Sequence, residues 1–502
     1  YSLSRLYAQL QEDRGRHGDT INDRFGAWAR VITLFRVLHD GVNAADGLHI
    51  PARRGSFFDP DASPFLEGRP RGSVRQRGAI LDVPRISDGV VFRVLDQLLM
   101  LGGERLLYKG LDVEQIGSVY EGLMGFDVQV AEGASVTLTP EHVVVNLEVI
   151  LAAPPGERAK QLKALANTDI KDKAAGEIRE AKTVDALYAA LSRRISSRQP
   201  GLLAKGTLVL QPGEERRRSG SHYTPRALTQ PIVETTLRPI LEQLGAEPTP
   251  EQLLALKICD PAMGSGAFLV ETCRQLADRL VEAWRRTGTM PSLRPDEDPV
   301  LHARRLVAQR CLYGVDKNPL AADLARLSMW LVTFAREHPF TFVDHSLRCG
   351  DSLVGLSREQ IVSMSLDVRS WSQPSVLVRP VVDQAVKRAE HLRKEIHAIG
   401  DPPDTERLRE LWRDANEALA TARVLGDLVV AAFFSADSDK ARRKAIDAVG
   451  EKASQWLQTG AHDAELKGMV RELREGPHPI EPFHWEIEFP EVFASDSVVA
   501  SA

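Results

Sequence analysis

The chain repeats one pattern three times between residues 253 and 353, in which a short apolar segment leads to an aspartate. Residues 253–259 precede Asp260, residues 311–315 precede Asp316, and residues 347–349 stand just before Asp351. Apolar residues at helical spacing follow the first two aspartates. Short strands that alternate with helices predict a doubly wound α/β sheet of parallel strands. The carboxyl ends of such strands meet along one edge of the sheet, so the three aspartates should converge there.

A glycine turn follows the first of these strands. Gly264 and Gly266 stand between Asp260 and a helix that begins near Phe268. Glycines let the backbone approach a ligand closely, and the start of the helix offers free N–H groups. The third glycine of the dinucleotide fingerprint is missing, because Leu269 stands at its position. An acidic residue before the turn would repel a phosphate, so the pattern favours a ligand with a cationic group such as an ammonium.

The second aspartate suits a ribose. A carboxylate at the end of the second strand can accept hydrogen bonds from both ribose hydroxyls. Asp316 lies much farther beyond Asp260 than the roughly 20 residues of a simple dinucleotide-binding unit, and the extra length contains another helix. Each aspartate alone could be a capping or turn residue. Three at successive strand ends predict a ligand site.

Composition excludes several classes of protein. Hydrophobic residues make up 43% of the chain and charged residues 26%, which are values of ordinary globular proteins. A net charge of −5 gives no chain-wide basic field, although a local groove could still be basic. The four cysteines are too scattered for a disulfide framework or a CxxC metal site, so no metal ligands are predicted. The longest apolar run, at residues 428–434, is far shorter than the roughly 20 residues of a membrane helix. A cytoplasmic protein without a membrane partner is expected.

The first half of the chain has a different texture. Helical patterns occupy residues 1–50, 89–102 and 113–124, and strands are predicted at residues 143–151 and 207–210. Residues 51–78 are rich in Gly, Pro and Arg and contain Phe57, Phe58 and Phe65. This stretch could follow a phosphate backbone, or it could be a solvated loop held by three buried rings. Residues 180–182 match the nuclease pattern Glu-x-Lys, but their charged, helical surroundings favour a solvated helix.

A long helical hairpin is predicted after residue 357. Two apolar stripes at helical spacing, within residues 382–399 and 408–419, flank the sequence Asp-Pro-Pro-Asp at residues 401–404. Prolines end helices, so this sequence reads as the turn between them. The predicted organisation has a mostly helical N-terminal domain at 1–205, a ligand-binding core at 206–358, a helical insertion at 359–478, and a return to the core at 479–502.

Four segments resemble motifs of a known family, the adenine-N6 DNA methyltransferases that use S-adenosylmethionine. Residues 260–268 (DPAMGSGAF) resemble motif I, and residues 220–225 (GSHYTP) resemble motif X. Residues 314–319 (GVDKNP) and 350–353 (GDSL) are similar to motifs II and III. The order X, I, II, III is that of the gamma arrangement. Residues 57–60, 64–66, 111–121 and 482–490 are similar to segments of large stand-alone methyltransferases from restriction-modification and phage-defence systems, including the BREX and DISARM types.

The resemblance implies a Rossmann-like, S-adenosylmethionine-dependent methyltransferase core and assigns roles to individual residues. Thr224 and its turn would hold the methionine carboxylate, Asp260 the ammonium, Asp316 the ribose and Asp351 the adenine amino group. Gly264 and Gly266 would let the cofactor lie against the backbone. The complete expected cofactor-binding set is Tyr223, Thr224, Pro225, Asp260, Ala262, Gly264, Gly266, Phe268, Asp316, Lys317, Asp351, Ser352 and Leu353.

The family's catalytic motif IV, (Asn/Asp)-Pro-Pro-aromatic, is expected beyond this chain. The family places it soon after the segment that residues 489–493 resemble, so no catalytic residue is predicted within the 502 residues. The sequence at residues 401–404 is a poor substitute, because Asp404 replaces the aromatic ring and the flanks are charged helices. The poor nucleophilicity of an adenine amine and the need to stack a flipped base explain why the family requires this motif.

The expected function is methyl transfer from S-adenosylmethionine to the N6 amino group of adenine in double-stranded DNA, within a restriction-modification or phage-defence system. Other subunits of that system are candidate partners. One alternative is a DNA-binding scaffold or regulatory subunit that binds the cofactor without catalysis. Another is a fused restriction enzyme and methyltransferase, or a methyltransferase that acts on RNA or on protein glutamine. The recognition sequence and the oligomeric state do not follow from the sequence.

Overall fold

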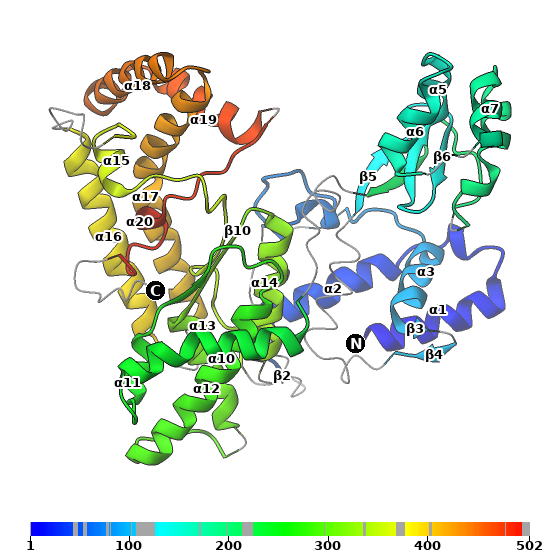
Figure 1. Cartoon of the computed structure of the whole chain (residues 1–502). Helices are drawn as coiled ribbons and strands as arrows, with labels where there is room; N and C mark the ends of the chain where they lie inside the picture. The colour runs from blue at the N-terminus through cyan, green and yellow to red at the C-terminus, as the bar shows by residue number, and fades with distance from the viewer. Residues whose placement is uncertain are drawn as a thin grey trace. The chain divides into compact units, whose positions relative to one another are not determined.

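The structure is a computed structural model of the chain (Figure 1). It describes residues 2–43, 49–53, 58–76, 80, 82–101, 103–106, 126–168, 170, 172–197, 199–212, 224–295, 297–334, 338–367, 377–400, 404–476 and 478–493. The chain divides into two compact units, one made of Tyr1–Gly117 with Thr224–Ala502 and the other of Ser118–Tyr223. This division does not fall at the predicted boundary between residues 205 and 206, and the four-part domain scheme stays a prediction.

The larger unit contains a parallel sheet of three strands in the order β11-β10-β9. These strands are β9 (Ile258–Asp260), β10 (Leu312–Asp316) and β11 (Leu347–Cys349). Gly314 of β10 pairs with Asp260 on one side, and Asp316 pairs with Cys349 on the other. The parallel arrangement confirms the three predicted strands. The first is shorter than predicted, because a capping box between Thr249 and Gln252 starts helix α11 (Pro250–Ala255), which includes residues 253–255.

Helices cover one face of this sheet. They are α10 (Arg226–Gln243), α12 (Ala267–Thr287), α13 (Pro299–Arg310) and α14 (Pro319–Val332). Asp298 caps α13 and Asn318 caps α14, and each cap precedes a proline at the first helical position. Leu312 and Leu347 belong to the same buried core as these helices. Side chains alternate between the faces of a strand, so Tyr313 and Val315 point the other way, where they pack against Phe483 and Phe489.

The predicted insertion is helical, as expected. It contains α15 (Arg358–Val362), α16 (Val378–Ala398), α17 (Thr405–Phe434), α18 (Asp439–Thr459) and α19 (Asp463–Glu475), and α20 (Trp485–Glu488) lies in the segment that returns to the sheet. Both predicted apolar stripes contribute to one core, for example through Val386 of α16 and Leu419 of α17. Asp404 caps α17 by accepting a hydrogen bond from Arg407 N at 3.1 Å. Residues 401–403 lie outside the described residues.

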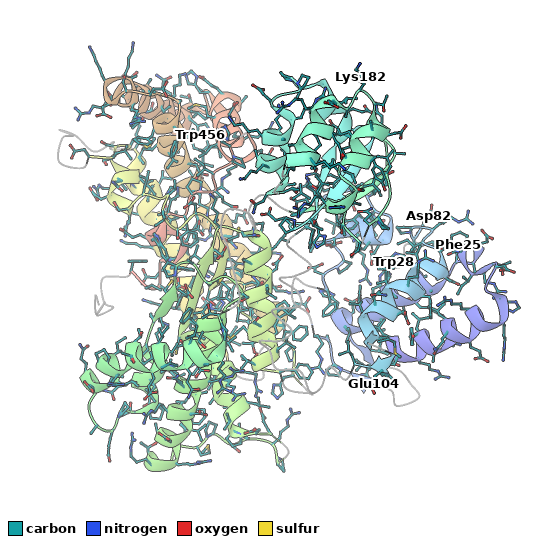
Figure 2. The ribbon with its side chains drawn as sticks, turned by 45° about the vertical axis from the view of Figure 1, so that its right-hand side comes forward. Phe25, Trp28, Asp82, Glu104, Lys182 and Trp456 are labelled. Carbon is teal, nitrogen blue, oxygen red and sulfur yellow. The ribbon has the colours of Figure 1, made fainter. Side chains whose placement is uncertain are left out.

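The N-terminal part of the larger unit is mostly helical. It contains α1 (Leu3–His17), the 3₁₀ helix η1 (Ile21–Asp23), α2 (Ala27–Asp40), η3 (Pro64–Glu67) and α3 (Asp88–Leu99), with the short pairs β1 (Val42–Asn43) with β2 (His49–Ile50) and β3 (Met100–Leu101) with β4 (Glu104–Arg105). The helix predicted over residues 89–102 therefore ends earlier, because residues 100–101 pair with β4. Trp28 on α2, which is labelled in Figure 2, donates its indole N–H to Leu66 O at 3.1 Å.

The structure tests part of the interpretation of residues 51–78 as a loop held by three buried rings. Phe65 is 67% exposed, so the prediction of three buried rings is wrong at that position, and Phe57 lies outside the described residues. Phe58 does stack against Phe340. Arg69 pairs with Glu67 at 3.0 Å and Arg75 with Asp40 at 2.7 Å, so these two guanidiniums already have carboxylate partners within the protein.

The smaller unit has its own core. Its elements are β5 (Phe126–Val130), β6 (Ser135–Leu138), β7 (Val143–Asn146), α5 (Leu147–Ala152), α6 (Arg158–Ala166), α7 (Asp172–Glu180), α8 (Val184–Ala190), η5 (Ser192–Arg194) and β8 (Leu208–Pro212). β5 pairs with β8 and β6 with β7, both antiparallel. The strand predicted at residues 143–151 is wrong beyond residue 146, because Asn146 accepts hydrogen bonds from Glu148 N and Val149 N and so starts α5. The solvated helix predicted for the Glu-x-Lys match holds only for Glu180, which ends α7, because Ala181 and Lys182 lie beyond the helix and Ala181 is buried.

Candidate functional site

The three aspartates predicted to converge do so at one edge of the parallel sheet. Asp260 and Asp316 are the last residues of β9 and β10. Asp351 follows β11 by two positions, and Gly350 before it donates its N–H to Asp316 O at 2.9 Å. The site therefore lies where the carboxyl ends of three neighbouring strands meet, which is where open α/β sheets bind ligands.

The turn after β9 is tied to the neighbouring strand by its backbone. Met263 N donates to Val315 O at 3.0 Å, and Gly264 N donates to the Asp316 carboxylate at 2.8 Å. Ala262 N donates to the Asp260 carboxylate at 3.0 Å. Two strand-end aspartates thus shape the same turn. An isolated sequence motif would not reveal that Asp316 supports the glycine turn from the next strand.

The two glycines of this turn have different surroundings. Both have positive φ, +53° at Gly264 and +82° at Gly266, a conformation that glycine adopts without strain. A Cβ at position 264 would meet nothing within 4 Å, so this backbone faces open space. A Cβ at position 266 would lie 3.2 Å from both Cα and Cβ of Ala325. Gly266 is therefore needed for the close packing of the start of α12 against α14, and Gly264 leaves the edge of the sheet accessible.

Asp316 is half-buried, and each of its carboxylate oxygens accepts one backbone hydrogen bond. Oδ2 accepts from Gly264 N and Oδ1 from Asn318 N, both at 2.8 Å. A carboxylate has roughly four acceptor positions, so it can still accept hydrogen bonds from a ligand. Because both of its oxygens are fixed, the direction in which Asp316 can receive a diol is also fixed.

Asp260 has the electrostatic character of a site for a cation. Its carboxylate is half-buried, and among the described basic side chains none forms an ion pair with it. Burial raises the pKa of Asp260, the hydrogen bond from Ala262 opposes this, and the neighbouring Asp316 carboxylate raises that pKa further. A positive ligand group placed here would relieve the repulsion between the two carboxylates.

The loop after β11 is held by hydrogen bonds to the return segment, residues 480–493. Asp351 N donates to Glu481 O at 2.7 Å, and Trp485 donates its indole N–H to Ser352 O at 3.1 Å. The Asp351 carboxylate accepts from Leu353 N at 3.1 Å, and Lys317 Nζ lies 3.7 Å from it. Leu353 is 94% exposed at the tip of the loop. An apolar side chain left this open next to the Asp351 carboxylate is suited to contact the flat face of a ligand.

The remaining predicted residues lie nearby or outside the described ranges. Thr224 and Pro225 come directly before α10, and Arg226 in the first turn of α10 pairs with Glu271 of α12 at 3.3 Å. That ion pair brings the start of α10 to the first turns of the helix that follows the glycine turn. Phe268 is half-buried against the main core, and Ala262 is exposed. Tyr223, like residues 111–121 of the upstream resemblance, lies outside the described residues.

Sequence reasoning missed two residues that shape this site. Glu481, through its carbonyl, and Trp485, through its indole, hold the loop of Asp351 although both are more than 120 positions away in the chain. The resemblance of residues 482–490 to a family segment was a signal for Trp485, but no pattern pointed to Glu481. Within the described ranges, no group of three or more His, Cys, Asp and Glu side chains is arranged to hold a metal ion. None of the described helices is long and apolar enough to cross a membrane.

Comparisons with known proteins indicate a class for the region that contains this edge. Residues 245–420 match the family described as the DNA-methyltransferase domain of MmeI. A protein of Methanocaldococcus jannaschii, provisionally named a type II restriction enzyme and methyltransferase, is 21% identical over 320 residues. The aligned region is 54% of this chain and 26% of that relative, so the chain matches about a quarter of the relative's length. No solved structure matches the chain. The comparisons support a methyltransferase domain of the restriction-modification type.

Proposed function

We propose that this chain carries the cofactor-binding part of an adenine-N6 DNA methyltransferase with the gamma order of motifs and a doubly wound, Rossmann-like core. The observation that carries the proposal is the convergence of Asp260, Asp316 and Asp351 around an open glycine turn, within the region that matches a DNA-methyltransferase family. DNA is the proposed partner. A restriction-modification or phage-defence system, with further subunits, is the proposed setting. Because the substrate is cellular DNA, the cytoplasm is the expected place of action.

S-adenosylmethionine fits the chemistry of these residues and would supply the methyl group. Asp260, which lies close to a second carboxylate and has no described cationic partner, would receive the ammonium. Asp316 would accept hydrogen bonds from the ribose hydroxyls, and Asp351 from the adenine amino group. Gly264 would let the backbone approach the ligand, Leu353 would cover the adenine ring, and Thr224 would bind the carboxylate.

The reaction also requires a group that makes the adenine amine nucleophilic. Its lone pair is delocalised into the ring, so an acceptor must bind the amine as charge develops and an aromatic ring must hold the flipped base. We propose that an (Asn/Asp)-Pro-Pro-aromatic segment following residue 493 in the natural protein supplies both groups. The Asp-Pro-Pro-Asp sequence at 401–404 is not proposed for this role, because Asp404 serves as the cap of α17.

A labelled-methyl assay on duplex DNA tests this function. The natural full-length protein should transfer labelled methyl groups to DNA, and hydrolysis to nucleosides should yield N6-methyladenine. The 502-residue chain alone should bind S-adenosylmethionine in a calorimeter yet transfer no methyl group. Methylcytosine would contradict the adenine assignment and leave the cofactor site standing. N6-methyladenine made by the 502-residue chain alone would contradict the proposed place of the catalytic motif.

A fused restriction enzyme and methyltransferase is the second candidate. It is favoured by the name of the Methanocaldococcus jannaschii relative, which combines both activities. Incubating the full-length protein with unmethylated plasmid and Mg²⁺ separates the candidates. Site-specific cleavage supports the fused enzyme, and methylation without cleavage supports a stand-alone methyltransferase. Binding of S-adenosylmethionine without either reaction would support the scaffold alternative.

A further inference from the structure

The return segment, residues 480–493, lies between the sheet and the inserted helices. Its first residues extend the site edge, where Pro482 forms a parallel bridge with Asp351 and Phe483 N donates to Val354 O at 2.8 Å. Its middle packs on the sheet face that carries Tyr313 and Val315. In Figure 1 the short red helix α20 lies beside α17, and these two helices are in contact. The segment is therefore held by two different parts of the protein.

Arg393 of α16 is the central contact of this arrangement. Its side chain is fully buried. Nη1 donates to His345 O at 2.6 Å, next to β11, and Nη2 donates to Glu488 O at 2.7 Å in the return segment. Nε lies 3.3 Å from the Glu491 carboxylate, and the guanidinium carbon lies 4.5 Å from the centre of the Trp412 ring on α17. One side chain of the insertion thus connects the sheet, the return segment and the second helix of the hairpin.

The carboxylates of Glu488 and Glu491 in the return segment likewise have partners on more than one element. Glu488 receives Arg423 of α17 at 2.6 Å and Arg348 of β11 at 3.0 Å. Glu491 accepts a hydrogen bond from the Tyr313 hydroxyl at 3.2 Å. Burial and the Glu491 carboxylate raise the pKa of Tyr313 well above its ordinary value. Each carboxylate is therefore bound both from a strand and from the insertion.

Such a network adds little net stability for the number of charges that it buries. Buried ion pairs lose much of their attraction to desolvation, and apolar packing of similar volume is often as stable. Their geometry, in contrast, is specific, because a planar guanidinium must face its acceptors in a fixed fork. The arrangement is thus better suited to fixing one position of the segment than to adding stability.

The position that this network fixes lies near β9, the outermost described strand of the sheet. Glu491 contacts Tyr313, which pairs with Cys259 of β9, and Lys257 just before β9 lies 5.7 Å from the Tyr313 ring. Among the described strands, none pairs with the outer edge of β9. Within the described residues, the outer edge of β9, the strand that ends at Asp260, is therefore open to pair with a further strand.

We propose that Arg393 is a positioning residue through which the inserted helices set the place of the catalytic segment. This inference rests on the proposed function, in which the catalytic motif follows residue 493. Arg393 touches neither the cofactor site nor the reacting atoms, and acts through Glu488 and Glu491. The insertion is then part of the catalytic geometry rather than an appendage of the core.

The test compares Arg393→Met with Arg388→Met in the natural full-length protein. Both substitutions remove an arginine from α16, but Arg388 is exposed. Arg393→Met should lower kcat for DNA methylation by about a hundredfold, the scale of a misplacement of roughly 1 Å. The Kd for S-adenosylmethionine and the KM for DNA should stay near their wild-type values, and Arg388→Met should change none of these. Unchanged kcat in a folded Arg393→Met variant would overturn the proposal.

Two further variants keep the test decisive if Arg393→Met does not fold. Arg393→Lys keeps the charge but loses the fork, and should lower kcat by about tenfold. Arg393→Met combined with Glu491→Gln should be more active than Arg393→Met alone, because no carboxylate is then left buried without its cation. Wild-type kcat in Arg393→Lys, or no gain from Glu491→Gln in any variant that folds, would count against the proposal.

The positioning role can be separated from the proposed function. If the wild-type protein methylates nothing, the proposed function fails, and hydrogen exchange then decides the role of Arg393. The amides of Phe483 and Phe489, which bond to Val354 O and Trp485 O, should exchange faster in Arg393→Lys, whereas those of α12 should not. Equal exchange in wild type and variant would refute the positioning role.

Discussion

Replacing Asp260 by Asn should change stability and cofactor affinity in opposite directions. Asn keeps an oxygen that can accept the hydrogen bond from Ala262 N, so the turn after β9 should persist. It removes the negative charge that burial and Asp316 both disfavour in the ligand-free protein. It also removes the charge that we propose binds the ammonium of S-adenosylmethionine. A residue that only capped a turn would produce neither effect.

The expected magnitudes follow from these contacts. A hydrogen bond to a charged group contributes about 1.5–3 kcal/mol, so the affinity for S-adenosylmethionine should fall roughly ten- to a hundredfold. The pKa of Asp260 is higher in the folded protein than in the unfolded chain. The protein therefore loses stability as the pH rises from the pKa of the unfolded state to that of the folded state. Removing this charge should stabilise the ligand-free protein at neutral pH by about 0.2–1 kcal/mol, the scale of partly exposed charge pairs.

Calorimetry with S-adenosylmethionine and thermal unfolding without it measure the two effects in the same preparation. Asp278→Asn is the matched control, because Asp278 is an exposed aspartate on α12 and should change neither quantity. Unchanged affinity together with a lower melting temperature would refute the assignment. It would mean that Asp260 holds the turn and does not meet a cation.

The same site makes three further predictions. Asp316→Ala removes the acceptor of Gly264 N and Asn318 N as well as the proposed ribose contact, so cofactor affinity measured by calorimetry should fall roughly ten- to a hundredfold in a folded variant. Gly266→Ala should lower the melting temperature more than Gly264→Ala. Both positions have positive φ, which costs an alanine about 1–2 kcal/mol, but only a Cβ at position 266 also meets Ala325. Equal losses would contradict the packing role of Gly266. The Kd for S-adenosylmethionine should rise as the pH falls through the pKa of Asp260, and Asp260→Asn should abolish that dependence.

Local patterns were enough to predict the strands and the site edge. Each aspartate directly follows a short apolar run, and parallel strands bring their carboxyl ends to one edge whatever the length of the connections. The positions of Asp260 and Asp316 therefore follow from residues within a few places of them. The same reasoning gave the two long helices of the insertion from their apolar spacing.

Errors arose where a side chain competed with the hydrophobic pattern. Residues 143–151 contain the β-branched side chains of a strand, yet Asn146 accepts two backbone N–H groups and turns the chain into α5. Thr249 and Gln252 do the same before β9. Phe65 was expected inside and is 67% exposed, because hydrophobicity alone does not say which side of a short 3₁₀ helix is covered.

The buried network was beyond sequence reasoning for a different reason. Arg393 bonds to His345 and Glu488, and no periodicity connects residues so far apart in the chain. One signal was available, since Arg393 stands four positions after Ala389 and three before Ile396, on the buried stripe of α16. A charged residue on an apolar stripe needs a partner, but the sequence does not say which of 69 carboxylates provides it.

Glu488 makes the stability of this network depend on pH. Its carboxylate is buried between Arg348 and Arg423. Burial raises the pKa of Glu488, but the Arg348 and Arg423 guanidiniums prevail and lower it from 4.5 to about 2. A depressed carboxylate pKa stabilises the fold above the unfolded pKa, and this contribution is lost as the pH falls from about 4.5 to about 2.

The shift in the pKa of Glu488 corresponds to about 3 kcal/mol of stability. Removing one partner of a buried ion pair typically costs about 3–5 kcal/mol, which agrees with this value. Glu488→Gln should therefore lower the free energy of unfolding by about 3 kcal/mol at neutral pH, because two guanidiniums that are only 18% and 17% exposed lose their counter-charge. Urea unfolding measures this, with Glu475→Gln as the control, because Glu475 is an exposed residue of α19. The difference between wild type and variant should shrink as the pH approaches 2, where Glu488 becomes protonated. A difference that stays constant down to that pH would show that Glu488 acts through packing and not through its charge.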